Sequence, residues 1–587
     1  MAPKILTTTI MKFWITAMRS SRKIVLFRFI FFCLFFLFIC KFYFSYVRLL
    51  NIFTIDDNDG EDNPSINRSR NCLLASNQLR LHGPEIDGFF RDYPPLKCAL
   101  RKDEWISIEN MSIRLNEESV QIHGGYINCT YIGYKRGKDD HELRTTRKLG
   151  DVPSGSPVLD EVFRLRCKAL DDETFESTYV LPLPLTTETI QRVETAMSDT
   201  KKRMKIINQP PPLNLNVYII GFDSLSRLTF QRKLKQMFKY LTQDLNGVVM
   251  EGYNIVGDGT PQALIPILTG KTEVELPLTR KRFPDAQHVD VYPWVWNEYK
   301  DNGKNFDSRI RTLTHGRIAL LGYVTLYGED SPSVGTFTYR LKGFLKQPTD
   351  YYMRTFHMVS EKFDGHPNGR WCFGNRSHHE VHFQYVKDFF DVTPRWAPKF
   401  AFQFHSVYSH DDLNAVEIAD GYMVEHLKYF KENVMNNSVL IVMSDHGHRF
   451  SQLRATHQGK LEERLPMFSV VMPAWFKKQF PVHMKNLRTN TKRLTTPFDI
   501  RNDLDGFEPE FSVSSSNNVT VEYLEIDFLT KPGGAHYEAS VTFDVRANEI
   551  HINLDSVSHV NAYGDKPHCV VDKDYFLATW CVCLDKI

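Results

Sequence analysis

The sequence reads NVYIIGFD at residues 216–223 and NSVLIVMSDHG at residues 437–447. Both runs are apolar and rich in β-branched residues, which is typical of strands buried on both faces of a parallel sheet. In such open sheets, ligands bind beyond the carboxyl ends of the strands. Two strands far apart in the chain can therefore bring Asp223, Asp445 and His446 to one place. Carboxylate and imidazole ligands together suit Zn or Mn.

Strand-like and helix-like segments alternate around these two runs. The spacing of apolar residues predicts a helix over 230–245, and further strands are expected at 318–330, 399–410 and 465–476. The segment PQALIPILTG (261–270) begins with Pro and ends with Gly, as helices commonly do. This alternation predicts an α/β fold with a doubly wound, largely parallel sheet.

Composition divides the chain into parts, and the Pro-rich run INQPPPLNLN (207–216) marks one boundary. The apolar alternation in 539–554 also indicates an antiparallel pair near the C-terminus. The expected parts are a cytosolic tail (1–23), a transmembrane signal-anchor (24–46), a stem (47–75), a Cys-containing, β-rich luminal module (76–206), the main α/β domain (207–505) and a Cys-rich β add-on (506–587).

Residues 24–46 form an unusually apolar segment, IVLFRFIFFCLFFLFICKFYFSY. It supplies about 20 residues able to span a bilayer, because Arg28 and Lys41 near its ends can snorkel. Basic residues precede it and the acidic run DDNDGED (56–62) follows, so the positive-inside rule places the N-terminus in the cytosol. We expect a single-pass type II membrane protein of the Golgi, the wider secretory pathway or the plasma membrane. A cleaved signal peptide is the alternative.

Cysteines and sequons agree with an oxidising, luminal or extracellular setting for the rest of the chain. Eight cysteines lie outside the apolar segment, an even number that permits disulfides. They are Cys72, Cys98, Cys129, Cys167, Cys372, Cys569, Cys581 and Cys583. N-glycosylation sequons occur at Asn67, Asn110, Asn128, Asn375, Asn436 and Asn518. The net charge of +2 shows no large excess of Lys and Arg, so nucleic-acid binding is not expected.

Short motifs in a fixed order resemble the alkaline phosphatase superfamily, which includes sulfatases, nucleotide pyrophosphatases and phosphoethanolamine transferases. GFDSLSR (221–227) resembles its first metal-Asp motif, and MSDHGHR (443–449) resembles its Asp-His-Gly metal motif. TPQALIPILTG (260–270) resembles the sulfatase nucleophile segment, in which the nucleophile precedes Leu-Thr-Gly by eight residues. Counting back from Leu268 leads to Thr260.

A closer resemblance is to an uncharacterised animal family of alkaline-phosphatase-like membrane proteins, abundant in nematodes and without a settled activity. The runs that carry it include GFLKQPTDYYMR (343–354) and RWCFGN (370–375). GKLEERLPMF (459–468) resembles the Glu-rich, Leu-Pro stretch that leads to a late strand in the superfamily.

The resemblance implies one metal site, with Zn as the expected ion, held by Asp223, Thr260, Asp445 and His446. Taken singly, such residues are more often helix caps or loop residues, so the metal hypothesis depends on their combination. Thr260 would be the nucleophile, its weak hydroxyl activated by the metal. The resulting phospho-threonine would be resolved by water or by an acceptor alcohol.

The run HSVYSHDD (405–412) leaves a second metal site open. Two-metal phosphodiesterases of the superfamily carry Asp-x3-His here, but Ser406 stands where that Asp is expected. The spacing of His405 and His410 resembles phosphoethanolamine transferases, in which the corresponding His contacts substrate or a loosely held metal. His410 and also His457, near the position of the superfamily's last active-site His, are therefore candidate catalytic residues.

The leading hypothesis is a metal-dependent phosphoester or phosphodiester hydrolase, or a phospho-substituent transferase, whose substrate the sequence does not identify. One alternative is a catalytically inactive ectodomain that serves binding. Another is a sulfuric ester hydrolase, which the sequence disfavours. Formylglycine forms from Cys or Ser in a Cys/Ser-x-Pro-x-Arg context, whereas position 260 is Thr and Pro261 follows it directly.

Overall fold

The computed structural model describes residues 79–98, 104–206, 213–257, 259–300, 322–364, 371–373, 376–499, 521–529, 536–544 and 549–559. All of them belong to the unit Leu73–Ile587. The expected membrane segment 24–46 and the stem lie outside the described residues, as do Cys72 and the three C-terminal cysteines. In the described part of the chain, no helix has both the length and the apolar character needed to cross a membrane.

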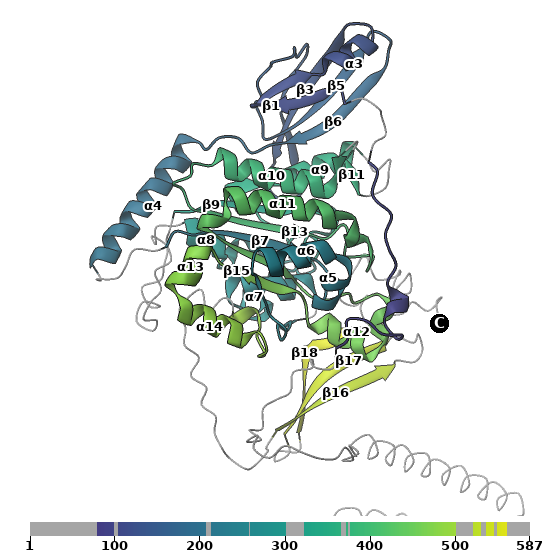
Figure 1. The fold of residues 1–587 in the computed structure, drawn as a ribbon, viewed down its shortest axis with the longest axis vertical. Helices are drawn as coiled ribbons and strands as arrows, with labels where there is room; N and C mark the ends of the chain where they lie inside the picture. Colours follow the sequence, from purple (N-terminus) through teal and green to yellow (C-terminus); the bar gives the residue numbers. More distant parts are fainter. Residues whose placement is uncertain are drawn as a thin grey trace, which may run out of the picture. The chain divides into compact units, whose positions relative to one another are not determined.

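A seven-stranded sheet lies at the centre of the described unit, in the order β10-β9-β13-β7-β14-β15-β8 (Figure 1). The first five strands in this order pair in parallel, whereas β15 pairs antiparallel with both β14 and β8. The structure thus confirms a mixed α/β fold with a mainly parallel sheet. The strands are β7 Asn216–Phe222, β8 Val248–Val249, β9 Val324–Glu329, β10 Tyr351–Tyr352, β13 Lys399–His405, β14 Ser438–Ser444 and β15 Phe468–Val471.

Both faces of this sheet are covered, because alternate strand residues enter two different cores. All residues of β7 are buried; Tyr218 and Ile220 belong to one core, and Val217 and Ile219 to the other. Helices α10 (His378–Val392) and α11 (Asp420–Asn433) pack into the first core, and α7 (Thr260–Thr269) packs into the second. The apolar continuity of the strand sequence therefore reflects helices on both sides.

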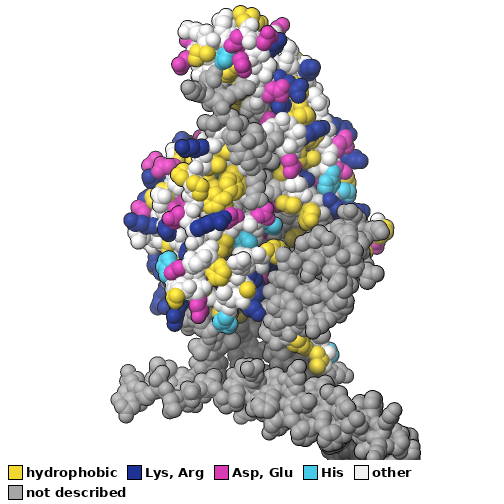
Figure 2. Space-filling model, turned by 90° about the vertical axis from the view of Figure 1, so that its right-hand side faces the viewer, with side chains coloured by type: hydrophobic (Ala, Val, Ile, Leu, Met, Phe, Trp, Pro, Cys, Tyr) yellow, Lys and Arg dark blue, Asp and Glu magenta, His cyan; other side chains and the backbone are white. Residues whose placement is uncertain are grey.

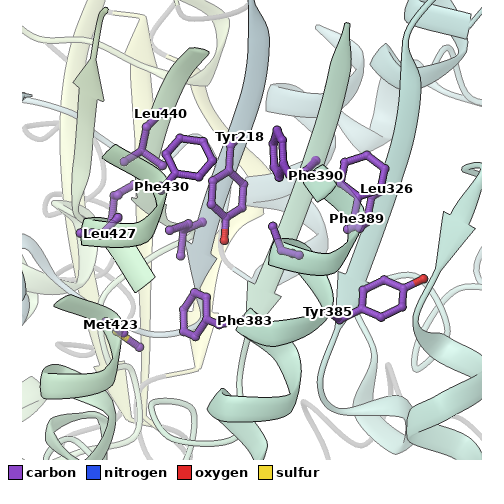
Figure 3. Close-up of a cluster of buried hydrophobic side chains, with 14 of the residues drawn as sticks. Tyr218, Leu326, Phe383, Tyr385, Phe389, Phe390, Met423, Leu427, Phe430 and Leu440 are labelled. Atoms are coloured by element: carbon purple, nitrogen blue, oxygen red, sulfur yellow. The ribbon is translucent and has the colours of Figure 1, made fainter. Parts of the chain in front are cut away.

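The first core is rich in aromatic rings around the central strand. Figure 3 shows the Tyr218 ring of β7 among Phe383 and Phe390 of α10 and Phe430 of α11. The ring centroids of Tyr218 and Phe430 lie 5.0 Å apart. Such aromatic packing fixes α10 and α11 against the strand that leads to Asp223.

We expect Phe383→Ala to lower the free energy of unfolding by about 3–5 kcal/mol, because the removed ring is fully buried and leaves a cavity. Chemical denaturation followed by tryptophan fluorescence measures this change. Val482→Ala is the control, since Val482 is 64% exposed and its truncation should change stability by less than about 0.5 kcal/mol. Equal midpoints for the two variants would contradict the packing described for this core.

Several predicted elements differ from the observed ones. The predicted helix over 230–245 is broken into α5 (Arg227–Lys233), α6 (Lys235–Lys239) and a π turn (Tyr240–Asp244), because Leu234 has a non-helical backbone. The predicted strand over 465–476 is shorter, since Pro473 lacks a backbone donor and precedes α13. The remaining helices of the domain are α8 Val295–Lys300, α9 Arg354–Phe363, α12 His457–Arg464, α13 Ala474–Gln479 and α14 Pro481–Asn490.

The N-terminal module has its own small core beneath an antiparallel sheet in the order β4-β3-β5-β6. Residues 117–122 form a short helix that Asn116 caps through its side chain. The helix α4 then leads to the main domain. Bounds in this module are β1 Ile106–Glu109, β2 Ser112–Leu115, α3 Glu117–Ile122, β3 Ile127–Arg136, β4 Leu143–Leu149, β5 Val162–Ala169, β6 Thr174–Val180 and α4 Thr187–Ile206.

Two disulfides lie within the described residues. Cys129–Cys167 joins β3 to β5, inside the N-terminal module. Cys98–Cys372 instead joins the N-terminal region to β11 (Cys372–Phe373) of the main domain. The grouping of cysteines along the sequence did not predict this second link, because Cys372 stands alone in the middle of the chain.

Near the C-terminus, β16 (Val521–Leu529), β17 (His536–Asp544) and β18 (Glu549–His559) form an antiparallel sheet. The antiparallel pair predicted within 539–554 is confirmed by the pairing of β17 with β18. On the face drawn in Figure 2, basic and acidic side chains of the described residues are interspersed, and neither sign gathers into one patch.

Candidate metal centre

Two adjacent parallel strands deliver the predicted metal ligands to one place. β7 and β14 are neighbours, with Phe222 opposite Ser444, so Asp223 and Asp445 follow at the same level of the sheet. Ligand atoms of Asp223, Asp445 and His446 all lie within 4.8 Å of one another, and all three residues are buried. The strand register therefore brings together residues separated by more than 200 positions in the sequence.

His446 is oriented toward both carboxylates. Its Nδ1 donates a hydrogen bond of 2.8 Å to the carbonyl oxygen of Gly447, which leaves Nε2 as the unprotonated nitrogen of the neutral ring. That Nε2 lies 3.3 Å from Asp445 Oδ2 and 3.9 Å from Asp223 Oδ1. A hydrogen bond from the ring nitrogen that does not bind the metal holds a metal-ligating imidazole in the correct tautomer.

Ser224 links the two carboxylates, although it was not among the residues predicted from the sequence. Its backbone N–H donates to Asp445 Oδ1 at 2.9 Å, and its hydroxyl donates to Asp223 Oδ1 at the same distance. The residue has a φ of 59°, an uncommon value outside Gly. The sequence feature that could have identified Ser224 is a small polar residue directly after an Asp at the end of a strand.

One carboxylate oxygen at the centre is left for another ligand. Asp445 Oδ1 accepts from the backbone N–H groups of Ser224 and His446. No described residue gives Asp445 Oδ2 a hydrogen bond of good geometry, although the atom is buried. A buried oxygen without a donor is costly, so a cation bound at this oxygen would remove an unfavourable contribution.

The electrostatics of the centre also favour a cation. Burial, and then the neighbouring Asp445, raise the pKa of Asp223. Burial raises the pKa of Asp445 to about 6. Two carboxylates this close cannot both ionise in a buried setting unless a positive charge compensates them. Two carboxylates and one neutral imidazole match the donor preferences of Zn and Mn, so the residues fit a divalent metal ion.

Thr260 lies beside these residues, at the first position of α7. The residue is half-buried, and its interaction with the Asp445 carboxylate lowers the pKa of that carboxylate. The chain can start a helix here because Gly259 has a φ of 130°, which L side chains rarely adopt, and because Pro261 needs no hydrogen bond in the first turn. The structure thus brings the predicted nucleophile to the predicted ligands.

Gly259→Ala should lower both stability and turnover. The substitution is strained at this φ, and the added Cβ would lie 2.8 Å from Gln262 Oε1. We expect a loss of about 1 kcal/mol or more in stability and a reduction in kcat of about 10-fold or more, since small displacements of reacting groups are expensive. Thermal unfolding and steady-state kinetics measure the two effects.

Gly421→Ala provides the control for this substitution. Gly421 lies on α11, and nothing would come within 4 Å of an added Cβ. That variant should be neutral or slightly more stable, because Ala favours a helix by about 1 kcal/mol over Gly. If Gly259→Ala behaved in the same way, the strained entry into α7 would have no functional role.

His410 lies near the centre, as predicted. Its Nδ1 is 2.5 Å from Asp411 Oδ1, and the side chain is 38% exposed. Burial lowers the pKa of His410, but the negative charges of Asp223 and Asp411 outweigh it and leave the pKa raised. An imidazole whose charge interacts with Asp223 can hold or release a proton near that carboxylate.

The other histidines named by the motifs differ in position. His405 is buried within the sheet, where Nδ1 lies 3.8 Å from Asp330 Oδ2. His448, which the sequence analysis did not select, is buried beside the centre; burial, and then His410 and His446, lower its pKa to about 4. His457 is exposed at the first position of α12, and no contact among the described residues joins it to the metal-centre residues. Its catalytic role therefore stays a prediction.

The Glu-rich motif has a structural role in the described fold. Glu462 on α12 is buried and receives both guanidinium nitrogens of Arg232 at 2.8 Å. The hydroxyl of Ser226 also donates to Glu462, at 2.7 Å. This network fixes α12 against α5, close to the strand end that carries Asp223.

Comparison with a known family accounts for most of the chain. Residues 91–305 and 317–508 match the model of a family described as "Protein of unknown function (DUF229)". The chain belongs to the DUF229 family. The two matched DUF229 stretches include every residue of the metal centre and Thr260. Among curated proteins, no relative of this DUF229 chain is found.

The chain is also similar, at low sequence identity, to several solved structures. A protein in the alkaline phosphatase superfamily from Vibrio parahaemolyticus has 13% identity and a TM-score of 0.30, with 63% of this chain and 91% of that chain covered. The soluble domain of lipooligosaccharide phosphoethanolamine transferase A from Neisseria meningitidis has 10% identity and a TM-score of 0.29, with 50% and 87% covered. Phosphonate monoester hydrolase from Silicibacter pomeroyi has 12% identity and a TM-score of 0.31, with 62% and 94% covered. These scores are low, so the proposals below depend on the site's own residues.

Proposed function

We propose that this protein is a metal-dependent phosphoester or phosphodiester hydrolase, or a phospho-substituent transferase, with Thr260 as its nucleophile. The observation that carries the proposal is the meeting of a buried Asp-Asp-His set with a hydroxyl that interacts with one of its carboxylates. A binding module has no need of this combination, which is why we favour an enzyme over an inactive ectodomain.

The metal would be held by Asp223, Asp445 and His446 together with the Thr260 hydroxyl. When bound, a divalent ion, for which we propose Zn, would compensate the two carboxylates and lower the pKa of the Thr260 hydroxyl. The fixed His446 tautomer and the Ser224 hydrogen bonds keep the protein ligands in place before substrate arrives.

The protein's own residues supply the remaining steps. Thr260, whose hydroxyl pKa the bound ion would lower, gives its proton to water and attacks phosphorus, so that an Oγ1–P bond forms while the bond from phosphorus to the leaving oxygen breaks. His410 donates a proton to the leaving oxygen, and Asp411 stabilises the charged imidazole that this step requires. In the second step, His410 takes a proton from water or from an acceptor alcohol, whose oxygen bonds to phosphorus as the Oγ1–P bond breaks, and Oγ1 regains a proton from water.

The compartment is part of the proposal. We place the reaction in the secretory lumen or outside the cell, with residues 24–46 as the membrane anchor. Two disulfides among the described residues support this placement, because such bonds persist in oxidising compartments.

The test is metal analysis of the purified full-length protein, combined with turnover of p-nitrophenyl phosphate and bis(p-nitrophenyl) phosphate before and after chelation. We expect about one divalent ion per chain and turnover that disappears with the ion and returns when Zn is added back. Absence of both metal and turnover would favour the binding function instead. A second equivalent of tightly held metal would show that the His410 region completes another site.

A further inference from the structure

Helices α13 and α14, with the turn that follows them, form a basic hairpin over residues 473–494. This segment contains six Lys or Arg residues and no Asp or Glu, whereas the whole chain has 72 Lys and Arg against 70 Asp and Glu. The excess of positive charge is therefore local. The six cations are Lys477, Lys478, Lys485, Arg488, Lys492 and Arg493. Figure 1 draws both helices on its left, away from the right-hand face that Figure 2 shows.

The described fold does not neutralise this charge. Five of the six cations are exposed, and none of the six forms an ion pair with a carboxylate of the described residues. Lys477 donates to the carbonyl oxygens of Leu245 and Asn246, at 3.1 and 3.2 Å. The segments on either side of β8, against which the hairpin packs, carry Asp244 and Glu251, but neither pairs with it. The basic hairpin thus offers its cations to solvent.

The apolar side of α14 is already used by the protein. Met484 is 4% exposed, and Leu487 packs against the second core of the main domain. Lys485 and Arg488, each one position further along the helix, are exposed. A helix that lies in a membrane surface keeps a continuous apolar face free for lipid, and on α14 that face is buried. The exposed side of the hairpin therefore fits a charged partner in water better than a lipid surface.

The arrangement of the cations suits a linear polymer of repeating negative charge. Lys485 and Arg488 are three positions apart on α14, a spacing that places Cβ atoms about 5–6 Å apart. Lys492 and Arg493 follow directly after the helix and extend the charged surface. Like charges this close repel one another, and a polyanion laid along them removes that repulsion and releases its own counterions.

The disulfides indicate which kind of polyanion the hairpin meets. Cys98–Cys372 and Cys129–Cys167 favour an oxidising, luminal or extracellular setting. Linear polyanions in that setting are polysaccharides that carry sulfate and carboxylate groups, whereas nucleic acids belong to reducing compartments.

We propose that the basic hairpin binds a linear, sulfated polysaccharide. This surface is separate from the metal centre. The strand β15 leads into α13 after Val471, which pairs with Leu440 in the first half of β14, whereas Asp445 follows the last residue of β14. The hairpin thus starts from the opposite end of that strand, and binding there does not depend on the proposed reaction.

The experiment is a calorimetric titration of the full-length protein with a size-defined heparin oligosaccharide at several salt concentrations. We expect the double variant Lys485→Ala/Arg488→Ala to weaken binding by about 10-fold or more, and the salt dependence of log Kd to fall by about two, one for each cation removed. Lys428→Ala/Lys431→Ala is the matched control, because it removes the same charge from exposed positions of α11 and should bind as wild type does. Thermal unfolding checks that both variants are folded.

Four results would overturn the proposal. They are no heparin binding by wild type at about 0.15 M salt, where a Debye length of about 8 Å still leaves contacts at the surface; an equal loss in both double variants; equal affinity for chemically desulfated heparin; and equal or tighter binding to phosphatidylserine vesicles or duplex DNA. Turnover of bis(p-nitrophenyl) phosphate should be the same in both variants and wild type. Heparin binding without any turnover would support the hairpin assignment and count against the proposed reaction.

Discussion

Asp445→Asn will remove the bound metal and lower kcat/KM for phosphate esters by more than about 100-fold, since loss of an outer-shell partner alone costs about 10–100-fold. Asp445 lies at the centre of the donor set, where its Oδ2 faces His446 Nε2 at 3.3 Å. An Asn oxygen can still accept the backbone hydrogen bonds from Ser224 and His446, so the variant should fold. Metal analysis and steady-state kinetics on the same preparation measure the effect.

Stability gives an independent check on the same variant. Burial raises the pKa of Asp445, which means that the ionised carboxylate is unfavourable without a cation. In chelator, Asp445→Asn should therefore unfold at a higher temperature than wild type near pH 8, and with added Zn the order should reverse. Asp285→Asn, at an exposed position, should match wild type in both conditions. A variant that kept its metal and its full activity would exclude Asp445 as a ligand.

Thr260→Ala should abolish turnover while the metal stays bound. Removal of a nucleophile typically costs several orders of magnitude in kcat, and we expect a loss of at least about 10³-fold. The three remaining ligands still offer two carboxylates and an imidazole, so metal content should be close to that of wild type. Rapid-quench detection of phospho-threonine in wild type, and its absence in the variant, measures the covalent step directly.

Thr260→Ser is the matched control for this prediction. It keeps the hydroxyl and removes only a methyl group, so kcat should fall by no more than about 10-fold. If Thr260→Ala retained wild-type turnover, an activated water rather than the protein would be the nucleophile. If Ser and Ala were equally inactive while both kept the metal, the methyl group of Thr260 would be needed to orient the hydroxyl.

The sequence predicted those parts of the site that depend on local pattern. Asp223 and Asp445 end apolar, β-branched runs, and parallel pairing of such runs places their ends together whatever lies between them. Thr260 was predicted from its distance to Leu268 in a segment that resembles the sulfatase nucleophile segment, rather than from any property of the residue itself. Burial on both faces of β7 was visible as an unbroken apolar run.

The rest of the site depends on contacts that no local pattern encodes. Ser224 joins the two carboxylates only because its backbone adopts a positive φ. The cavity that His410 lines is built from the turn after β9, α9 and the His410 loop, which are distant in sequence. The break at Leu234 was missed for a related reason: residues on both sides of it have helical spacing, and the core decides where the axis changes direction.

The Cys98–Cys372 bond has a consequence for how the chain is made. Its two cysteines are 274 residues apart, whereas Cys129 and Cys167 are separated by 38. At about 5–20 residues per second of synthesis, Cys98 waits roughly 14–55 s for its partner to leave the ribosome. During that interval Cys129 and Cys167 are both available to it, so their early pairing removes two of the wrong partners open to Cys98. Biosynthesis thus favours a fixed order, in which the module closes first and the long-range bond forms once β11 has been translated.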